Sequence, residues 1–212
     1  MLKNTRVLLL IALSVAGAAW ASDVAMLTQV TGQVAVSGKE GARAAVPFLK
    51  VNGGDKLTLG KNARVQMVYF GNGRQEVWKG EGQIEIGSLD GRSPSLKAEI
   101  SQLPPLVINQ LAKTPAAGQQ GRTGMVMVRS LGDPDAQDHL DKQYANLRAG
   151  AAADDTTPEV FLLSGLLDLK EYERAKKVLG ELKSKQLTQP AYEAVVDHFG
   201  PLVERAAAPP KN

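Results

Sequence analysis

The 212-residue chain contains no cysteine and only two histidines. Without cysteine, no disulfide can constrain the fold, so each folded part must bury enough apolar surface by itself. The lack of thiols and the scarcity of imidazoles also remove the usual ligands of zinc and other transition metals. We therefore expect neither a metal nor any other cofactor in this protein.

The two histidines have plain structural explanations. His139 lies among aspartates, but only Asp135 shares its helical face, so a solvated helix surface explains it better than a metal site. His198 follows Asp197 near the expected end of a helix, where a cation is favoured by the helix dipole.

Signatures of catalysis are also absent from the sequence. There is no Gly-x-Ser-x-Gly elbow and no P-loop, and the glycines of residues 71–73 and 80–82 are not followed by the helix that phosphate binding needs. Glu76, Glu81 and Glu85 lie in strand-like segments and are expected on the solvent side of a sheet, not as a glycosidase pair. We expect a protein that is not an enzyme; a hydrolase with an unrecognised site is the remaining alternative.

The one long apolar run, Val7–Gly17, comes near the N-terminus and ends shortly before Ala19-Trp20-Ala21. This order is typical of a secretory signal peptide, residues 1–21, cleaved between Ala21 and Ser22. The run is shorter than the ~20 residues that span a bilayer, although an uncleaved N-terminal anchor is the alternative. We expect a periplasmic or secreted protein that is not stably inserted in a membrane once the signal peptide is removed.

Charge gives little indication of an unusual partner. The formal net charge of +3 falls to about +1 without Lys3 and Arg6, and both signs are mixed along the rest of the chain. With no basic stripe, we expect no nucleic-acid partner.

Residues from about 23 to 92 have the period of short β-strands, and the β domain with its Pro/Gly-rich connecting segment is expected to span residues 22–131. Asn52-Gly53-Gly54-Asp55 is a strong turn signal, and the following segment alternates. Val65, Met67 and Tyr69 share one face of a strand, and Gln66, Val68 and Phe70 share the other. Asn72-Gly73 then suits a type I′ hairpin turn, which requires two residues with positive φ. Such a pattern predicts an antiparallel β roll or sandwich.

Prolines interrupt residues 93–131. We expect a short helix over Leu106–Lys113, a linker over Thr114–Gly124 and one more strand over Met125–Arg129. Whether this segment belongs to the β domain is left open by the sequence.

Residues 132–206 have a helical period. Helices are expected to begin at Asp133-Pro134 and Thr157-Pro158, with a short turn over Asp168–Glu171 before the next one. A last helix from Gln189-Pro190 to about Arg205 contains Pro201, which should kink or shorten it, and residues 207–212 should form a disordered tail. The fold class predicted for the whole chain is α+β, with an N-terminal β domain followed by a small C-terminal helical bundle.

The β half, residues 24–90, resembles the FecR family of periplasmic signalling domains. The resemblance rests on VTGQVAV (Val30–Val36), on the segment Leu49–Gly73 with its Gly54-Asp55, and on QIEIG (Gln83–Gly87). It implies an all-β extracytoplasmic module used for sensing or protein contact. The iron-citrate transducers of that family carry a cytoplasmic segment and a membrane span where this chain has a signal peptide.

The segment GLLDLKEYERAKKVLGEL (Gly165–Leu182) is similar to a tetratricopeptide hairpin, with Tyr172 and the small Ala175 after the turn. Such helical surfaces usually bind other proteins, and this expectation rests on the likeness alone.

Four residues are candidates for contact with a protein partner: Trp78, Phe70, Val68 and Tyr172. If Val77 faces the core, Trp78 points outward as an interface anchor would. The plainer interpretation is that Trp78 covers the second face of the sheet or packs on the helices. Val68 and Phe70 share an apolar second face on which the helical half is expected to dock.

The function favoured by these patterns is a non-enzymatic periplasmic module that senses a signal or binds a protein partner in the cell envelope. A module that binds envelope carbohydrate or polymer is the alternative, and a row of exposed aromatic rings would favour it. The sequence does not predict the oligomeric state.

Overall fold

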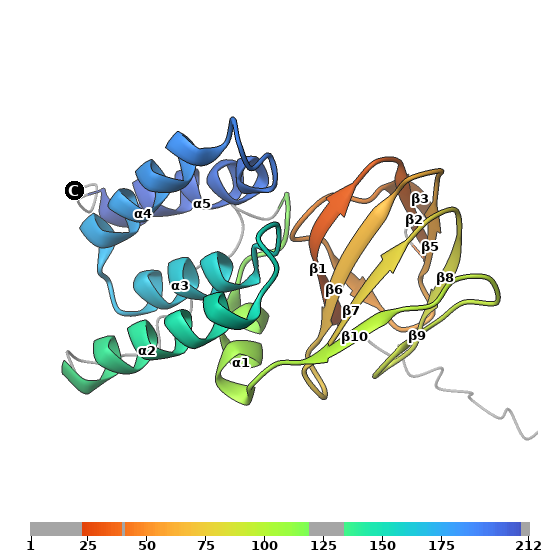
Figure 1. Cartoon of the computed structure of the whole chain (residues 1–212), viewed down its shortest axis with the longest axis horizontal. Helices are drawn as coiled ribbons and strands as arrows, with labels where there is room; N and C mark the ends of the chain where they lie inside the picture. The colour runs from red at the N-terminus through yellow and green to blue at the C-terminus, as the bar shows by residue number, and fades with distance from the viewer. Residues whose placement is uncertain (1–22, 40, 119–133, 209–212) are drawn as a thin grey trace, which may run out of the picture.

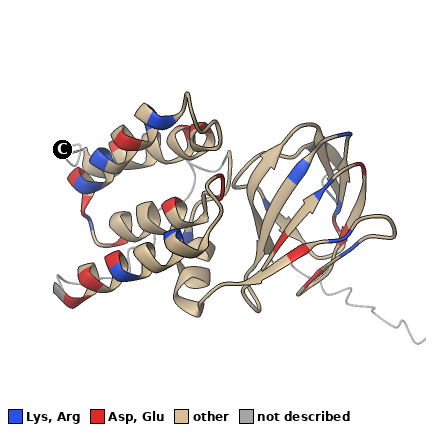
Figure 2. Cartoon of the chain, viewed as in Figure 1, with Lys and Arg blue, Asp and Glu red and all other residues tan. Residues whose placement is uncertain are grey.

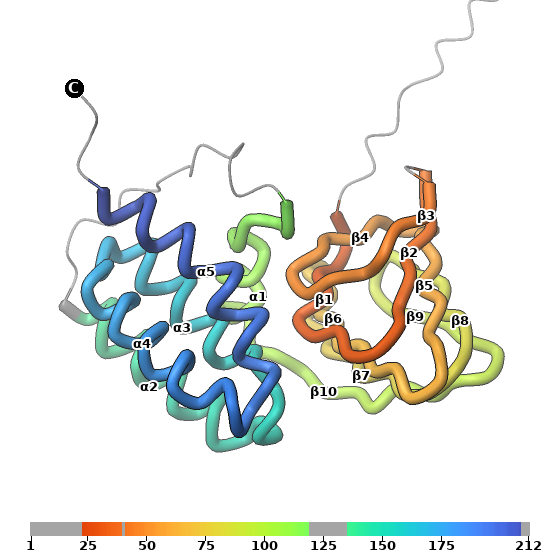
Figure 3. Tube along the Cα trace, turned by 90° about the horizontal axis from the view of Figure 1, so that it is seen from above, coloured from red at the N-terminus to blue at the C-terminus, as the bar shows by residue number. Residues whose placement is uncertain are grey.

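The computed structural model describes residues 23–39, 41–118 and 134–208. Its core is a sandwich of two antiparallel five-stranded sheets, and helices lie against the outer face of one of them (Figures 1 and 3). The predicted α+β fold class, with an N-terminal β part followed by C-terminal helices, is confirmed. The predicted signal peptide and the predicted strand Met125–Arg129 lie outside the described residues.

We call the two sheets A and B. Sheet A has the strand order β10-β7-β6-β1-β4 and contains β1 (Asp23–Thr31), β4 (Lys50–Asn52), β6 (Arg64–Tyr69), β7 (Arg74–Lys79) and β10 (Glu99–Gln102). Sheet B has the order β3-β2-β5-β8-β9 and contains β2 (Val34–Gly38), β3 (Gly41–Ala44), β5 (Lys56–Leu59), β8 (Gly82–Ile86) and β9 (Gly91–Arg92). The sequence left open whether residues 93–131 belong to the β part. Residues 99–102 do belong to it, because β10 pairs with β7.

The Gly54-Asp55 pair of the FecR-like pattern has a structural role here. It lies in the turn that carries the chain from β4 in sheet A to β5 in sheet B. The Asp55 carboxylate accepts a hydrogen bond from the Asn52 backbone N–H at 2.9 Å, and Gly54 adopts a φ of 91°. The Gly54 N–H also donates to the Ile86 carbonyl at 2.7 Å, which ties this turn to β8.

The hairpin of β6 and β7 forms as expected, but its turn is not of type I′. Only Gly73 has a positive φ, of 70°, and Asn72 does not. The Gly73 N–H donates to the Tyr69 carbonyl at 2.9 Å, so the loop spans residues 70–73 instead of two residues. Asn72 contributes through its side chain, which accepts a hydrogen bond from the Arg74 N–H at 3.0 Å. This side-chain contact satisfies the turn without a left-handed Asn72.

The five described helices begin and end close to the predicted positions. They are α1 (Pro105–Lys113), α2 (Pro134–Gly150), α3 (Thr157–Asp168), α4 (Tyr172–Lys185) and α5 (Ala191–Ala207). Pro201 was expected to kink or shorten the last helix; the shortening is wrong, because α5 runs through Pro201 to Ala207. The preceding residue is Gly200, which has no Cβ to clash with the proline ring. No described helix is both long and apolar enough to span a bilayer.

The chain has two apolar cores, one on each side of sheet A. The first lies between the sheets and includes Leu27, Val65, Met67, Trp78 and Ile84. The second lies between sheet A and the helices, where Met26, Val68 and Phe48 pack with α1, α3 and α5 side chains. Strand and helix residues therefore pack together in this second core, in agreement with the three layers seen in Figure 3.

Phe48 reaches from the β part into the core formed by the helices. It has a φ of 65°, unusual for a bulky residue, and only 1% of it is exposed. Its ring stacks on His198 with centroids 4.3 Å apart and meets Phe199 edge-on. Its N–H donates to the Leu27 carbonyl at 2.6 Å, which holds the loop against β1.

We predict that Gly73→Ala destabilises the protein by about 2 kcal/mol or more. A Cβ at this position would lie 2.2 Å from Ile108 Cδ1 and 2.9 Å from the Leu103 carbonyl oxygen, in addition to the strain of a positive φ. Gly54→Ala is the matched control, because Gly54 also has a positive φ but no atom within 4 Å of a new Cβ. Urea unfolding of both variants measures the difference; equal losses would show that the contact with α1 is unimportant.

Candidate functional site

Trp78 lies between the two sheets, not on a surface. Only 3% of it is exposed, and its indole N–H donates to Glu76 Oε2 at 2.9 Å. The expected exposed position is therefore wrong, and so is the alternative that Trp78 covers the second face of the sheet or packs on the helices. The reason is the strand parity, since Glu76 and Trp78 face the inner core while Val77 faces the other way.

Glu76 is the residue whose surroundings the sequence concealed. It was expected on the solvent side with Glu81 and Glu85, which are exposed, but Glu76 itself is 0% exposed. Its carboxylate accepts hydrogen bonds from Arg74 Nε at 2.5 Å, from Trp78 and from the Gly91 N–H at 3.1 Å. Because Gly91 lies on β9, Glu76 joins sheet A to sheet B, and the charge is stabilised by three donors.

Val68, Phe70 and Tyr172 all contact the core between sheet A and the helices. Val68 is fully buried there, and Phe70 and Tyr172 are half-buried against it. The expected docking of the helices on the face of Val68 and Phe70 is confirmed. Together with Trp78, the four candidate residues therefore do not form one exposed surface.

A buried polar cluster joins sheet A to the start of α3. Gln66 on β6 and Gln75 on β7 each donate from Nε2 to the Asp155 carboxylate, at 2.7 and 3.1 Å. The Thr157 N–H donates to the same carboxylate at 2.9 Å, and Gln66 also donates to the Thr157 hydroxyl at 3.0 Å. Gln66, Gln75 and Asp155 are buried, with 1%, 5% and 7% of each residue exposed.

Two ion pairs flank this cluster. Arg64 binds Asp154 at 2.8 Å, and Arg148 binds Glu159 at 3.1 Å while it donates to the Asp155 backbone carbonyl at 2.8 Å. Burial raises the pKa of Glu159, and the neighbouring Arg148 partly opposes this shift. The two arginines and three carboxylates of this interface carry a formal charge of −1, and the side-chain oxygens of Asp155 accept hydrogen bonds only from neutral donors.

A cavity of about 180 Å³ lies beside this cluster. The cavity is lined by residues of β7 and β10, of the end of α2, of the connection between α2 and α3, and of the start of α3. They include Gln75, Ser101, Gln102 and Asp155. The Oε1 atoms of Gln66 and Gln75 are buried and accept no hydrogen bond from the described protein atoms. Sequence reasoning missed this region, and the one available signal was the polar Gln66 on the apolar strand face of Val68 and Phe70.

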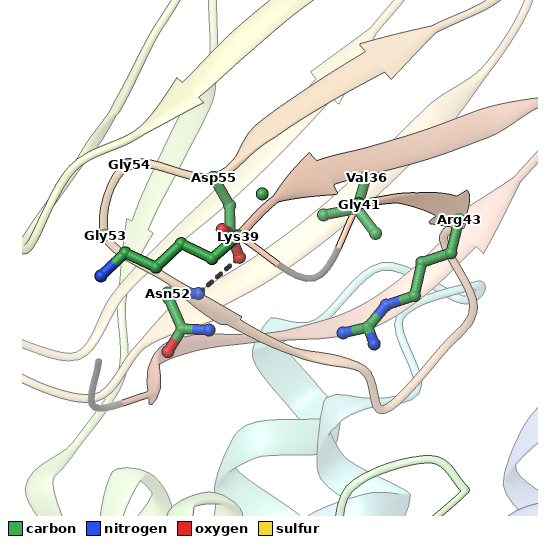
Figure 4. Close-up of a pocket in the computed structure, with 9 residues that line it drawn as sticks. Val36, Lys39, Gly41, Arg43, Asn52, Gly53, Gly54 and Asp55 are labelled. Atoms are coloured by element: carbon green, nitrogen blue, oxygen red, sulfur yellow. Dashed lines mark hydrogen bonds between the residues drawn. The ribbon is translucent and has the colours of Figure 1, made fainter. Parts of the chain in front are cut away.

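A larger hollow of about 530 Å³ lies among the turns joining β2 to β3 and β4 to β5 (Figure 4). Lys39 and Arg43 lie on opposite sides of Asn52, and Asp55 is held by its hydrogen bond within the turn (Figure 4). Glycines and the single apolar residue Val36 complete the lining. The described residues of its lining include the charged Lys39, Arg43 and Asp55, and among them there is neither a general base with a nucleophile nor an aromatic platform.

Charged residues of both signs are spread over strands and helices (Figure 2). Within the described parts of the chain, no three His, Asp or Glu residues come together as metal ligands would. His139 is exposed, and His198 lies in the middle of α5 instead of near its end. Burial lowers the pKa of His198 to about 4, against a hydrogen bond with the Pro115 backbone.

Comparisons with protein-family models, with curated proteins and with solved structures found no match to this chain.

We predict that Trp78→Ala lowers stability by about 3–5 kcal/mol, because it opens a cavity between the sheets. Trp78→Phe keeps a ring but loses the hydrogen bond to Glu76 and part of the buried volume, so its loss should be smaller than that of the alanine variant. Melting temperatures of both variants test this. An alanine variant as stable as the parent would contradict the inner position of the indole.

We predict that stability falls as the pH drops from about 6.5 to about 4, in part through His198. The folded protein binds this proton less readily than the unfolded chain, because burial lowers the pKa to about 4 from the ordinary 6.5. The contribution is fully present above pH 6.5 and about 3 kcal/mol is lost by pH 4. Urea midpoints at pH 7, 6, 5 and 4.5 should show a shallower decline in His198→Phe. His139→Gln, which removes an exposed histidine, is the control; parallel curves for the parent and His198→Phe would refute the assignment.

Proposed function

We propose that this protein is a non-enzymatic extracytoplasmic module that binds a protein partner in the cell envelope, as FecR-like sensing domains do. The N-terminal segment with signal-peptide character supports the compartment, and the FecR-like pattern of residues 24–90 supports the class. The partner surface cannot be the face of Val68 and Phe70, because the helices of the same chain already cover it.

The observation that carries this proposal is the edge strand β10. It pairs with β7 on one side, and no other described strand pairs with its outer edge. All four residues of β10 are exposed, including the apolar Ile100 at 56%. An edge of this kind offers main-chain donors and acceptors to an incoming strand, and an exposed apolar side chain adds affinity.

The carbohydrate-binding alternative has less support. Sugar modules use exposed rings for stacking, and Tyr69 and Trp78 are buried while Phe70 is half-buried. Every other aromatic side chain in the described residues is also buried or half-buried. A protein strand at β10 needs no such platform.

We predict that Ile100→Asp weakens capture of the envelope partner at least ten-fold without lowering the melting temperature, because Ile100 is exposed at the free edge. The capture is done with the mature chain on a support, from envelope extract, with the bound protein identified by mass spectrometry. Leu187→Asp is the matched control, since Leu187 is 96% exposed in the connection between α4 and α5. Equal capture by both variants would exclude β10 as the contact.

A further inference from the structure

The cavity beside β10 is lined by one buried acceptor without a described donor, on Gln75, and by one carboxylate, that of Asp155. The Oε1 atom of Gln75, on a side chain only 5% exposed, accepts no hydrogen bond from the described protein. Both glutamine amides are held in this orientation because their Nε2 groups donate to Asp155. A buried acceptor without a donor is unfavourable, so the site is suited to a donor that enters from outside the described chain.

The charges of the surrounding residues indicate that this donor is a cation. Arg64 is engaged with Asp154, and Arg148 with Glu159, which leaves the Asp155 carboxylate with neutral donors only. Oδ1 of Asp155 already accepts two hydrogen bonds, whereas Oδ2 accepts one, from Gln75. A buried carboxylate is normally balanced by a positive group.

The size and position of the cavity indicate what carries the cation. A volume of about 180 Å³ is below the ~300–1,000 Å³ of typical small-molecule pockets, but it accommodates the end of one side chain. Ser101 and Gln102 of β10 line it, and Ser101 lies opposite Gln75 in the strand register. In a strand added along β10, side chains alternate between the two faces, so one residue faces the side of Ile100 and the next faces the cavity.

We propose that this cavity receives the ammonium group of a lysine carried by an extended segment of the protein partner. The ammonium has three N–H donors and no acceptor, which fits Gln75 Oε1 and Asp155 Oδ2. The strand hydrogen-bonds to the edge of β10, and the lysine fixes its register. This inference rests on the proposed protein-binding function and adds the chemistry of the recognised residue.

The first experiment tests the cavity without any partner. The probe is n-butylammonium, which has the shape of a lysine side chain, and tetramethylammonium is the cation without N–H donors. We expect n-butylammonium to raise the melting temperature by a few degrees in a saturable way, and tetramethylammonium to have no such effect. A cavity that holds only water gives no difference between the two probes and overturns the proposal.

The variants Asp155→Asn and Asp154→Asn make the same charge change at adjacent positions. The Asp155→Asn protein can keep the native fold. The amide oxygen of the new side chain still accepts a hydrogen bond from the Thr157 N–H, and its NH₂ group can donate to Gln75 Oε1 after the Gln75 amide rotates by half a turn. We expect Asp155→Asn to lose the response to n-butylammonium and Asp154→Asn, where the native side chain is 58% exposed, to keep it. An undiminished response in a folded Asp155→Asn protein overturns the site.

The second experiment asks whether the partner uses the same cavity. Capture of the partner by the mature chain should be competed by n-butylammonium but not by tetramethylammonium, and it should fall at least ten-fold in Asp155→Asn. Amine binding without competition would overturn the lysine as occupant. Loss of capture in Ile100→Asp with no effect of Asp155→Asn would retain β10 as the contact and refute only the lysine.

Discussion

The packing of the helices on the outer face of sheet A determines the rest of the structure. Met26, Val68 and Phe48 are at most 1% exposed only because α1, α3 and α5 cover them. Burying each such side chain contributes about 1.5–3 kcal/mol, which offsets the roughly 1–3 kcal/mol of strain in the left-handed backbone of Phe48. Because the chain has no cysteine, no disulfide links the β part to the helices, and this shared core holds them together with the polar contacts around Asp155.

Polar groups determine how precisely the two parts meet. The apolar contact alone would tolerate small shifts of the helices over the sheet, whereas Gln66 and Gln75 reach the Asp155 carboxylate only in one arrangement. The cluster is buried, so the loss of any of these contacts leaves groups without partners in an environment that does not solvate them. In this arrangement the buried Asp155 carboxylate accepts hydrogen bonds from neutral donors and not from a cation. This feature makes the interface chemically unusual.

The sequence predicted the fold class and most of the helices because their signals are local. Strand parity placed Gln66, Val68 and Phe70 on one face, and proline positions marked the starts of α1, α2 and α3. The inner position of Glu76 was not predictable, because its three donors come from β7 itself and from Gly91 on another sheet. The left-handed Lys170 between α3 and α4 was equally hidden, since lysine has no local preference for that conformation.

The same packing explains why the candidate binding surface is the edge of sheet A and not the face that the sequence suggested. Sequence parity identified an apolar second face, and an apolar face is used either by the chain itself or by a partner. The helices of the chain cover it, and at the rim they leave β10 with its outer main-chain groups unpaired by any described strand. The end of α2 and the start of α3 lie next to that edge and place the Asp155 carboxylate beneath it. The helical part therefore does more than complete the core, because it supplies one wall of the cavity next to this free edge of sheet A.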